Sequence, residues 1–270
     1  MPELPEVQTV VNDLNKSIKG LTVKNVQLSN KLIWRDKRSR KTVLHDKKIL
    51  KVIRKGKNIL INLSGNNSLI VHLKMTGKLI FIKKINQYPK HTHFAAKLSS
   101  GYLYFNDIRR FGYLDLVKTD RLDGLPYLKS LGPDPFELDV AEFTALIKSK
   151  SRMIKPLLMD QTVIAGLGNI YADESLFAAK IHPKKLSSRI SKKKLETLFN
   201  KIVRILDQAI KARGSSVSDY VDGSGSAGSF QLSHKVYGHE GEPCPACNGK
   251  IIREAIGGRS AHYCPRCQRL

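Results

Sequence analysis

The feature that most constrains this chain is a pair of short cysteine motifs close to its C-terminal end. The four cysteines of the sequence stand as Cys244-Pro-Ala-Cys247 and Cys264-Pro-Arg-Cys267, with sixteen residues between the pairs. Each pair places two thiolates on one tight turn, and a hairpin between the pairs brings all four into a tetrahedron. Four thiolates fill the coordination shell of Zn²⁺ and leave no position for water. The spacing therefore predicts one structural zinc ion in a C-terminal ribbon.

The beginning of the chain bears on the state of these cysteines. The run MPELPEVQTV has no basic segment followed by an apolar stretch, so we expect no secretory signal. We therefore expect the chain to stay in a reducing compartment. In that reducing compartment cysteines are more often metal ligands than disulfides.

The charge balance indicates the class of partner. The 270 residues include 47 Lys and Arg against 23 Asp and Glu, which gives a formal net charge of +24. Such an excess favours a polyanion, because each neutralised phosphate releases condensed counterions. No long apolar run or lipidation motif is present, so we expect no membrane association. Nucleic acid is the favoured partner, although charge alone does not name a reaction.

Hydrophobic periodicity divides the chain into two halves. Apolar residues recur at helical spacing from Pro5 to Ile18, and Lys19-Gly20 follows as a stop signal. From there to about Val117 the pattern alternates with period two between turn signals, which predicts antiparallel strands in a sandwich. Beyond the linker at residues 131–136 the spacing is helical again. Residues 214–229 are rich in Gly and Ser, and this composition predicts a mobile loop.

Pro2 offers chemistry that few N-terminal residues can supply. A small second residue permits removal of Met1, which leaves a secondary amine at the start of the chain. Such an amine condenses with an aldehyde to a permanently charged iminium, and its pKa of about 8 leaves more of it neutral than a lysine amine. Glu3 and Glu6 could donate and accept protons beside it. Carboxylates are also favoured at helix N-termini, so this pattern alone leaves both interpretations open.

Several separated motifs together resemble the formamidopyrimidine-DNA glycosylases. The matching runs cover essentially the whole chain in the same order. They are Pro2-Glu-Leu-Pro-Glu-Val7, Arg54-Lys-Gly-Lys57, His72-Leu-Lys-Met-Thr-Gly77, Asp107-Ile-Arg-Arg-Phe-Gly112, Ile154-Lys-Pro-Leu-Leu-Met-Asp-Gln161, Gly166-Leu-Gly-Asn-Ile-Tyr-Ala-Asp-Glu-Ser175 and the terminal ribbon. The resemblance implies an α+β fold in three parts. These are a catalytic β-sandwich with a leading helix (1–132), a helix-two-turn-helix domain with a lesion loop near 214–231 (133–232), and a zinc finger (233–270).

The resemblance also implies base-excision repair by a bifunctional DNA glycosylase and lyase. Pro2 would attack C1′ of an oxidised purine nucleotide such as 8-oxoguanine, and the strand would then be cut by β,δ-elimination. Glu3 would act as general acid and base, Glu6 would support the site, and Lys57 would hold a phosphate. The partner would be double-stranded DNA with oxidised purines or abasic sites, bound by a monomer in the bacterial cytoplasm.

The resemblance assigns further residues to DNA contact. Extrusion of a base leaves a hole in the duplex, and the family's void-filling residues match Met75, Arg109 and Phe111. By pattern alone Met75 and Phe111 would more often be core residues. Lys155 aligns with a lysine near the damaged base, while Asn169 and Arg259 match residues that grip the backbone.

Two other functions remain open at this point. A sister enzyme of the endonuclease VIII type shares the proline chemistry but prefers oxidised pyrimidines. Leu4 after Glu3, the Arg109 and Phe111 context and the long Gly/Ser loop favour the purine enzyme. A basic zinc-ribbon protein that binds DNA without cutting it is the other alternative.

Overall fold

The computed structural model describes residues 1–35 and 41–270 and divides them into two compact units. Unit 1 contains residues 1–130 and 212–231, and unit 2 contains residues 131–211 and 232–270. Among the helices of these ranges, none combines the length and apolar character that a membrane span requires.

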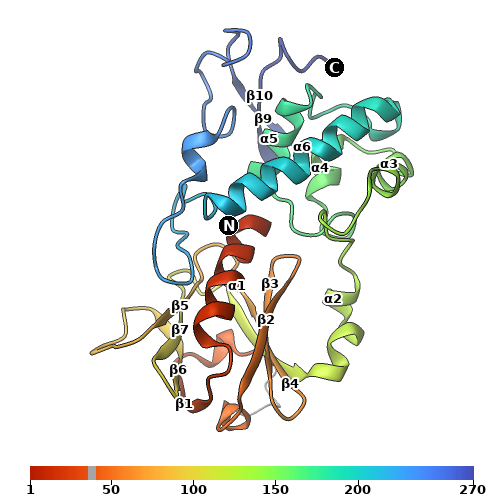
Figure 1. Ribbon diagram of the computed structural model, residues 1–270. Coiled ribbons are helices and arrows are strands. Elements are labelled where there is room, and N and C mark those ends of the chain that lie inside the picture. Colours follow the sequence, from red (N-terminus) through yellow and green to blue (C-terminus); the bar gives the residue numbers. More distant parts are fainter. Residues whose placement is uncertain (36–40) are drawn as a thin grey trace. The chain divides into compact units, whose positions relative to one another are not determined.

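Unit 1 begins with one long helix and continues almost entirely in strands (Figure 1). Its helices are α1 (Leu4–Ile18) and α2 (Pro126–Lys129), and its 3₁₀ turns are η1 (Lys31–Ile33), η2 (Lys41–Leu44) and η3 (Thr119–Gly124). Its strands are β1 (Val23–Leu28), β2 (Ile49–Lys55), β3 (Asn58–Leu63), β4 (Asn67–His72), β5 (Lys78–Ile82), β6 (Thr92–Leu98), β7 (Tyr102–Asn106) and β8 (Tyr113–Lys118).

The strands form two antiparallel four-stranded sheets, in the orders β1-β6-β7-β5 and β2-β3-β4-β8. The alternating apolar residues of β3, which are Ile59, Ile61 and Leu63, enter one core with Phe94 and Phe105 from the other sheet. Burial of such side chains on facing sheets is the main favourable term for a sandwich. The predicted α+β fold with a leading helix on a β-sandwich is confirmed.

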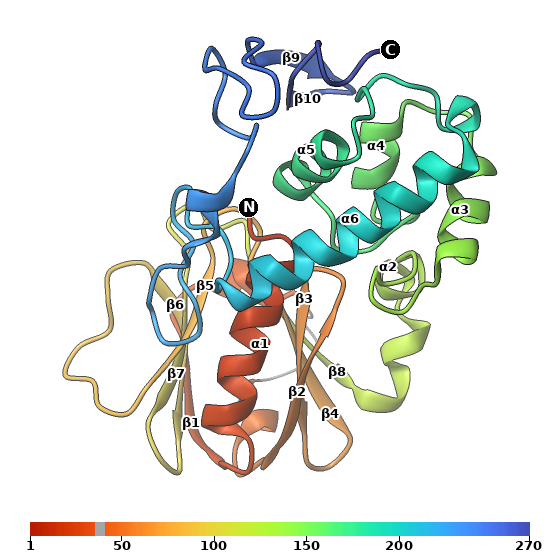
Figure 2. The same cartoon turned by 45° about the horizontal axis from the view of Figure 1, so that its top comes forward.

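Helix α1 completes the sandwich core. Figure 2 shows it running along the two sheets, and it contacts β2 and β3 of one sheet and β5 of the other. The apolar residues that predicted the helix, among them Val7, Leu14 and Ile18, are fully buried. Because this buried face fixes α1 against both sheets, the residues at its first turn are held by the core of unit 1.

The Gly/Ser-rich segment is part of unit 1 and is well anchored there. Tyr220 belongs to the sandwich core, and Val221 packs against a second apolar cluster that contains Ile80 and Tyr104. The Phe81 N–H on the edge strand β5 donates to the Gly223 carbonyl (3.0 Å). The composition predicted no packed element here, and these contacts correct that part of the prediction, whereas the mobility of the segment stays a prediction. The predicted boundaries assigned this segment to the helical domain instead.

Unit 2 is mainly helical. It contains α3 (Val140–Lys148), α4 (Ile154–Met159), α5 (Asn169–Ala178), the 3₁₀ turn η4 (Ser187–Arg189), α6 (Lys192–Lys211) and the strands β9 (Ile252–Ile256) and β10 (Arg259–Tyr263). The turn η5 (Phe230–Ser233) lies where the chain re-enters this unit. Helix α6 packs on α3 and α5, and it buries Leu195, Leu198, Ile202 and Leu206 as the helical spacing predicted.

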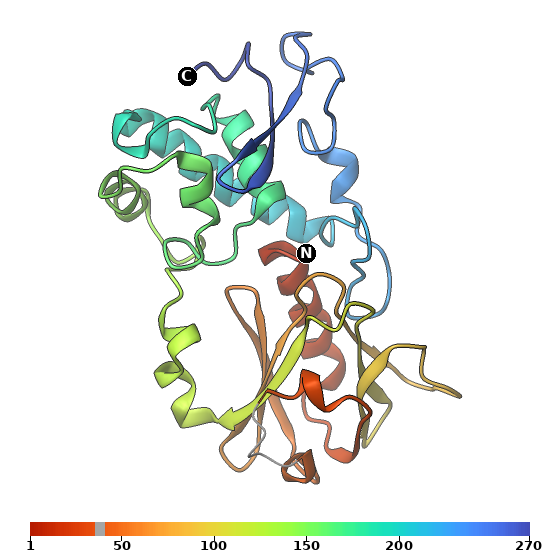
Figure 3. The same cartoon turned by 180° about the vertical axis from the view of Figure 1, so that it is seen from behind.

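The strands β9 and β10 form a hairpin, which we name the ribbon hairpin (residues 252–263). It lies beside α5 in the view from behind (Figure 3), and β10 contacts that helix. At the turn, Gly257 and Gly258 have φ of 58° and 77°, values that favour glycine. A Cβ on Gly257 would stand 2.5 Å from Pro156 Cγ on α4, so only glycine permits this approach.

Candidate functional site

Pro2, Glu3 and Glu6 lie together at the beginning of α1, as the sequence predicted. All three are buried, whereas Met1 is 46% exposed. Pro5 occupies the first turn, where its missing N–H costs no hydrogen bond. Met1 is thus the accessible residue at this end, and its removal would leave the Pro2 nitrogen as the chain terminus next to Glu3, whose N–H is bound by Glu6.

The carboxylate of Glu6 ties this end of the helix to the Gly/Ser-rich segment. One oxygen accepts the Glu3 N–H at 2.8 Å, and the other accepts the Ser215 N–H at 2.8 Å. The Tyr220 hydroxyl donates to the Glu6 carbonyl (3.3 Å). Burial, followed by the charge of Glu6, raises the pKa of Tyr220, so this hydroxyl remains a neutral donor. Glu6 therefore acts as a support between the helix start and residue 215.

Lys57 lies in the tight turn between β2 and β3. Gly56 before it has φ of 56°, and Lys55 pairs with Asn58 across the turn. His72 lies on β4 opposite Asn58, and its Nδ1 accepts the Lys74 N–H at 3.0 Å. Burial, followed by the charges of Lys74, Lys57 and Arg35, lowers the pKa of His72 to about 3. The sequence reasoning assigned no role to this neutral histidine, although it quoted the motif that contains it.

Asp107 organises the turn that follows β7. Its carboxylate is fully buried and accepts the Thr76 hydroxyl, the Arg109 N–H (3.2 Å) and the Gly112 N–H (2.7 Å). Three donors on one carboxylate fix the path of residues 107–112. The periodicity gave no sign of this role, because one aspartate after a strand is an ordinary turn residue.

The three predicted void-filling residues project from this region. Met75 and Phe111 are exposed, at 38% and 54%, and the Arg109 guanidinium stacks on the Phe111 ring with 4.7 Å between Cζ and the centroid. Large apolar side chains exposed on a rigid turn are more typical of a binding surface than of a core. The core interpretation of Met75 and Phe111 is therefore wrong. Their predicted contact with DNA stays a prediction.

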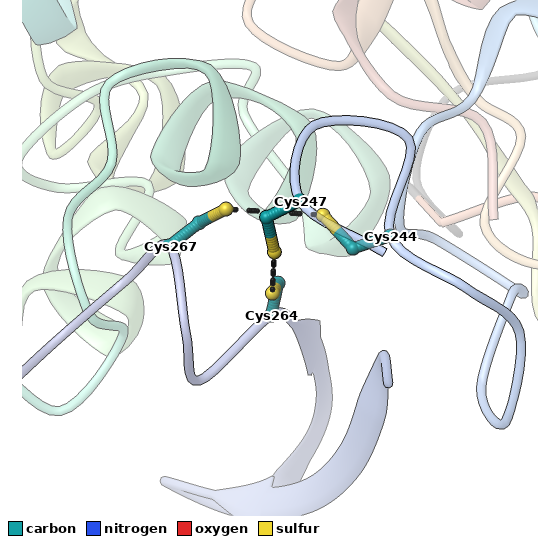
Figure 4. A group of neighbouring side chains, drawn as sticks. All are labelled: Cys244, Cys247, Cys264 and Cys267. Atoms are coloured by element: carbon teal, nitrogen blue, oxygen red, sulfur yellow. Dashed lines mark hydrogen bonds between the residues drawn. The ribbon is translucent and has the colours of Figure 1, made fainter. Parts of the chain in front are cut away.

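The four cysteines of unit 2 converge on one point (Figure 4). Their sulfur atoms all lie within 4.8 Å of one another, with 3.8 Å between Cys244 and Cys267 and 3.5 Å between Cys247 and Cys264. A tetrahedral zinc ion with bonds of about 2.3 Å requires sulfur–sulfur distances of about 3.8 Å. The cysteines are unpaired by disulfides, and the donor set and its geometry fit a zinc ion.

Two buried carboxylates hold the ribbon against the helices. Glu174 on α5 accepts the N–H groups of residues 235, 236 and 237 at 2.9 to 3.0 Å. Burial raises the pKa of Glu174 although these donors oppose the shift. Asp173, its neighbour, accepts the His262 N–H at 2.9 Å. Neither carboxylate was singled out from the sequence.

Lys155 has a different surrounding from the one predicted. Its side chain has no exposed surface, its Nζ lies 2.7 Å from an Asp173 oxygen, and it donates to the Ser260 carbonyl. An ammonium group that is enclosed and neutralised in this way is not presented to a ligand. These contacts join α4, α5 and the ribbon hairpin through Lys155. The predicted contact of Lys155 with the damaged base stays a prediction.

Asn169 and Arg259 lie on elements that pack together. Asn169 is the first residue of α5, and its buried Oδ1 has no hydrogen-bond partner within the described ranges. Arg259 begins β10 and is exposed. An open helix N-terminus, an amide and a guanidinium on adjoining elements offer donors suited to a phosphate. Lys57, Met75, Arg109 and Phe111 belong to unit 1, so the predicted contact residues are divided between the units.

Comparison with known families places three matches along the chain. Residues 1–114 match the formamidopyrimidine-DNA glycosylase N-terminal domain, residues 131–221 its H2TH domain, and residues 241–270 the zinc finger found in FPG and IleRS. The formamidopyrimidine-DNA glycosylase of Pelotomaculum thermopropionicum is 46% identical over the full length of both chains. That of Desulforamulus reducens is 41% identical over 100% of this chain and 99% of the relative.

Solved structures agree with this assignment. A complex between a Lactococcus lactis FPG mutant and DNA containing Fapy-dG has a TM-score of 0.93 and 35% identity, with both chains fully covered. A complex of MutM with DNA containing carbocyclic 8-oxo-G has a TM-score of 0.92 and 36% identity, again over both full chains. The chain therefore belongs to the formamidopyrimidine-DNA glycosylase family.

Proposed function

We propose that this protein is a bifunctional DNA glycosylase and abasic-site lyase that removes oxidised purines through its N-terminal proline. Once Met1 is removed, the Pro2 nitrogen attacks C1′ of the damaged nucleotide. The bond from C1′ to the base breaks, the base leaves with a proton, and the amine gives up its own proton. The bond from C1′ to O4′ then opens as Glu3 gives a proton to O4′, which leaves a cationic iminium between Pro2 and C1′. The iminium draws electrons from the sugar in the eliminations that cut the strand.

The observation that carries this proposal is the pairing of Pro2 with two buried carboxylates at one fixed helix end. Glu3 stands next to Pro2 and is 3% exposed, which suits a group that exchanges protons with a sugar away from bulk water. Glu6 accepts the Glu3 N–H and thereby fixes the direction in which the chain enters the helix. Glu3 would act as general acid and base, and Glu6 would keep it in place.

The relatives support the class of substrate. The Lactococcus lactis protein has been crystallised with DNA containing Fapy-dG and with DNA containing an abasic site, and MutM with DNA containing carbocyclic 8-oxo-G. For this chain, the net charge of +24 favours double-stranded DNA as the partner. Met75, Arg109 and Phe111 would occupy the space left by the extruded base, and Lys57, Asn169 and Arg259 would bind phosphates.

The ribbon would hold one structural zinc ion through Cys244, Cys247, Cys264 and Cys267. Four thiolates leave it no open position, so its contribution is to the folding of the ribbon. The side chains of unit 1, rather than the ion, would carry the proton transfers.

Borohydride trapping tests the reaction class. Processed protein incubated with a duplex containing 8-oxoguanine opposite cytosine, in the presence of borohydride, should form a covalent adduct, and mass spectrometry should place the link on Pro2. The adduct should disappear for Pro2→Gly and for protein that retains Met1. Release of the lesion base without an adduct, or inertness on every oxidised duplex, would overturn the proposal.

A parallel assay separates the purine and pyrimidine enzymes. A Lactococcus lactis relative has also been crystallised with DNA containing an oxidised pyrimidine, so pyrimidine lesions deserve the same assay. Single-turnover excision of 8-oxoguanine should exceed that of thymine glycol. A clear preference for thymine glycol would favour a function of the endonuclease VIII type.

A further inference from the structure

One face of α1 carries a second carboxylate that reaches the Gly/Ser-rich segment. Asp13 follows Glu6 by seven residues, a spacing of two turns that places both on the same side of the helix. The Asp13 Oδ2 accepts the Gly223 N–H at 3.1 Å and the Arg213 guanidinium at 2.6 Å. Glu6 accepts the Ser215 N–H. The segment is therefore fastened to α1 near each end of residues 215–223, with the Tyr220 hydroxyl bonded to the Glu6 carbonyl between these points.

The Arg213 side chain bridges two carboxylates at the distal point. Its Nη2 lies 2.6 Å from Asp13 and 2.6 Å from Asp222, and its Nε donates to Asp222 at 2.8 Å. The second oxygen of Asp222 accepts the N–H groups of Ser224 and Ser226 and the Ser224 hydroxyl. We name the set Asp13, Arg213 and Asp222 the clamp.

The clamp lies where the segment crosses the edge of a sheet. Tyr220 packs into the sandwich core, whereas Val221 packs on the cluster of Ile80 and Tyr104. Gly223 caps the Phe81 N–H of the edge strand β5. A Cβ on Gly223 would stand 2.8 Å from Asp13 Cβ, so this close approach requires glycine. These contacts define the course of the segment along α1 and β5.

We propose that Asp13 is a positioning residue for recognition of the damaged base, because it holds the distal part of the Gly/Ser-rich segment in place through Gly223 and Arg213. This inference rests on the proposed function and on the resemblance given above, which implies that residues near 214–231 form a loop over the lesion. The proximal contact of Ser215 with Glu6 does not involve Asp13, and it remains when the clamp is opened. Loss of the clamp therefore impairs the step that requires the base and spares the step that requires only the sugar.

The test compares two substrates on one enzyme. Asp13→Ala should lower the single-turnover rate of 8-oxoguanine release about 10-fold, the effect of losing hydrogen bonds to a charged group. Borohydride trapping and cleavage of a preformed abasic site in the same duplex should stay within roughly 2-fold of wild type, because no base is present to be positioned. Asp13→Asn keeps an acceptor for the Gly223 N–H but loses the charge, and we expect an intermediate loss of base release.

Arg213→Met opens the clamp from its other side and should reproduce the same split between the two substrates. Asp123→Asn is the matched control, since Asp123 is an exposed carboxylate of unit 1 paired with Lys55. It should leave both rates unchanged. Fluorescence of Trp34, the single tryptophan and a core residue of unit 1, reports whether each variant is folded.

Unchanged base release in Asp13→Ala and Arg213→Met would overturn the inference. So would a parallel fall of both rates in folded protein, because that pattern indicates a general effect on the catalytic helix end. If Asp13→Ala does not fold, the same comparison is decided by Arg213→Met, whose side chain is 45% exposed. A wild-type protein that forms no adduct on abasic DNA would contradict the proposed function instead, so the two failures are distinguishable.

Discussion

Two long segments with little regular structure, one in each unit, are attached to their units by different means. The Gly/Ser-rich segment of unit 1 is held by three carboxylates. Glu6 and Asp13 accept backbone N–H groups of the segment, and Asp222 accepts a hydrogen bond from a partly exposed arginine. The ribbon of unit 2 is held by four converging cysteines and by the buried side chains of Lys155, Asp173 and Glu174. The charged part of the first attachment depends on one arginine that is 45% exposed, whereas the second concentrates its free energy in a metal site and an enclosed ion pair. We expect the segment to be adjustable and the ribbon to be rigid.

Removal of the metal should give the largest effect. Structural zinc contributes about 10 kcal/mol or more to the folding of small zinc domains. Cys264→Ser, or treatment with a strong chelator, should unfold the ribbon and abolish detectable binding to lesion DNA. Trp34 fluorescence should show unit 1 still folded. Metal-free protein that binds DNA as the wild type does would contradict the structural role of the site.

Removal of one cation from each of the two attachments should lower the free energy of unfolding by unequal amounts. Lys155→Met leaves Asp173 buried without its counter-charge, and we expect a loss of about 3 kcal/mol or more in the unfolding free energy of unit 2. Arg213→Met removes a half-exposed guanidinium from unit 1, and we expect about 1 kcal/mol or less. Denaturant unfolding should follow unit 1 by Trp34 fluorescence and unit 2 mainly by helical circular dichroism. Equal losses would remove the distinction between the two attachments.

Salt dependence should show which cations of the two units bind phosphate. Lys57→Ala in unit 1 and Arg259→Ala in unit 2 should each reduce the slope of log affinity against log salt by about 0.9, the value for one phosphate contact. Lys155→Met should leave the slope unchanged, because that ammonium is already paired with Asp173. A lower slope for Lys155→Met would support the predicted contact of Lys155 with DNA.

Acid should weaken unit 1 through His72, and near neutral pH this is the smallest of the expected effects. Burial lowers the pKa of this residue from 6.5 to about 3. Between these values the unfolded chain binds a proton that the folded chain does not, so stability falls as the pH decreases through this window. The slope is at most about 1.4 kcal/mol per pH unit. Trp34 fluorescence isolates unit 1 from acid release of the metal in unit 2, and His72→Asn should flatten the slope. An unchanged slope in that variant would mean that other groups titrate.

Much of the architecture follows from local patterns. The helix from Pro5 to Ile18, the alternating strands and the two cysteine pairs are each specified by residues close together in sequence, because helix spacing, strand alternation and metal-ligand spacing are short-range properties. The order of separate motifs indicated the family in the same way. These predictions needed no knowledge of which distant residues meet.

The tertiary structure decided what the sequence left open, because burial and hydrogen bonding depend on partners far away in the chain. The approach of Asp13 to Gly223 and Arg213 turns a segment of mobile composition into an anchored one. The Lys155 ammonium is buried and paired with Asp173, whereas the sequence around Lys155 gives no sign that it leaves the surface. Asp107 fixes the turn that carries Phe111, and the Phe111 side chain is exposed there instead of entering the core. The sequence by itself determined the elements and the reactive residues. Long-range packing determined which charged side chains are buried in ion pairs and which are exposed to a ligand.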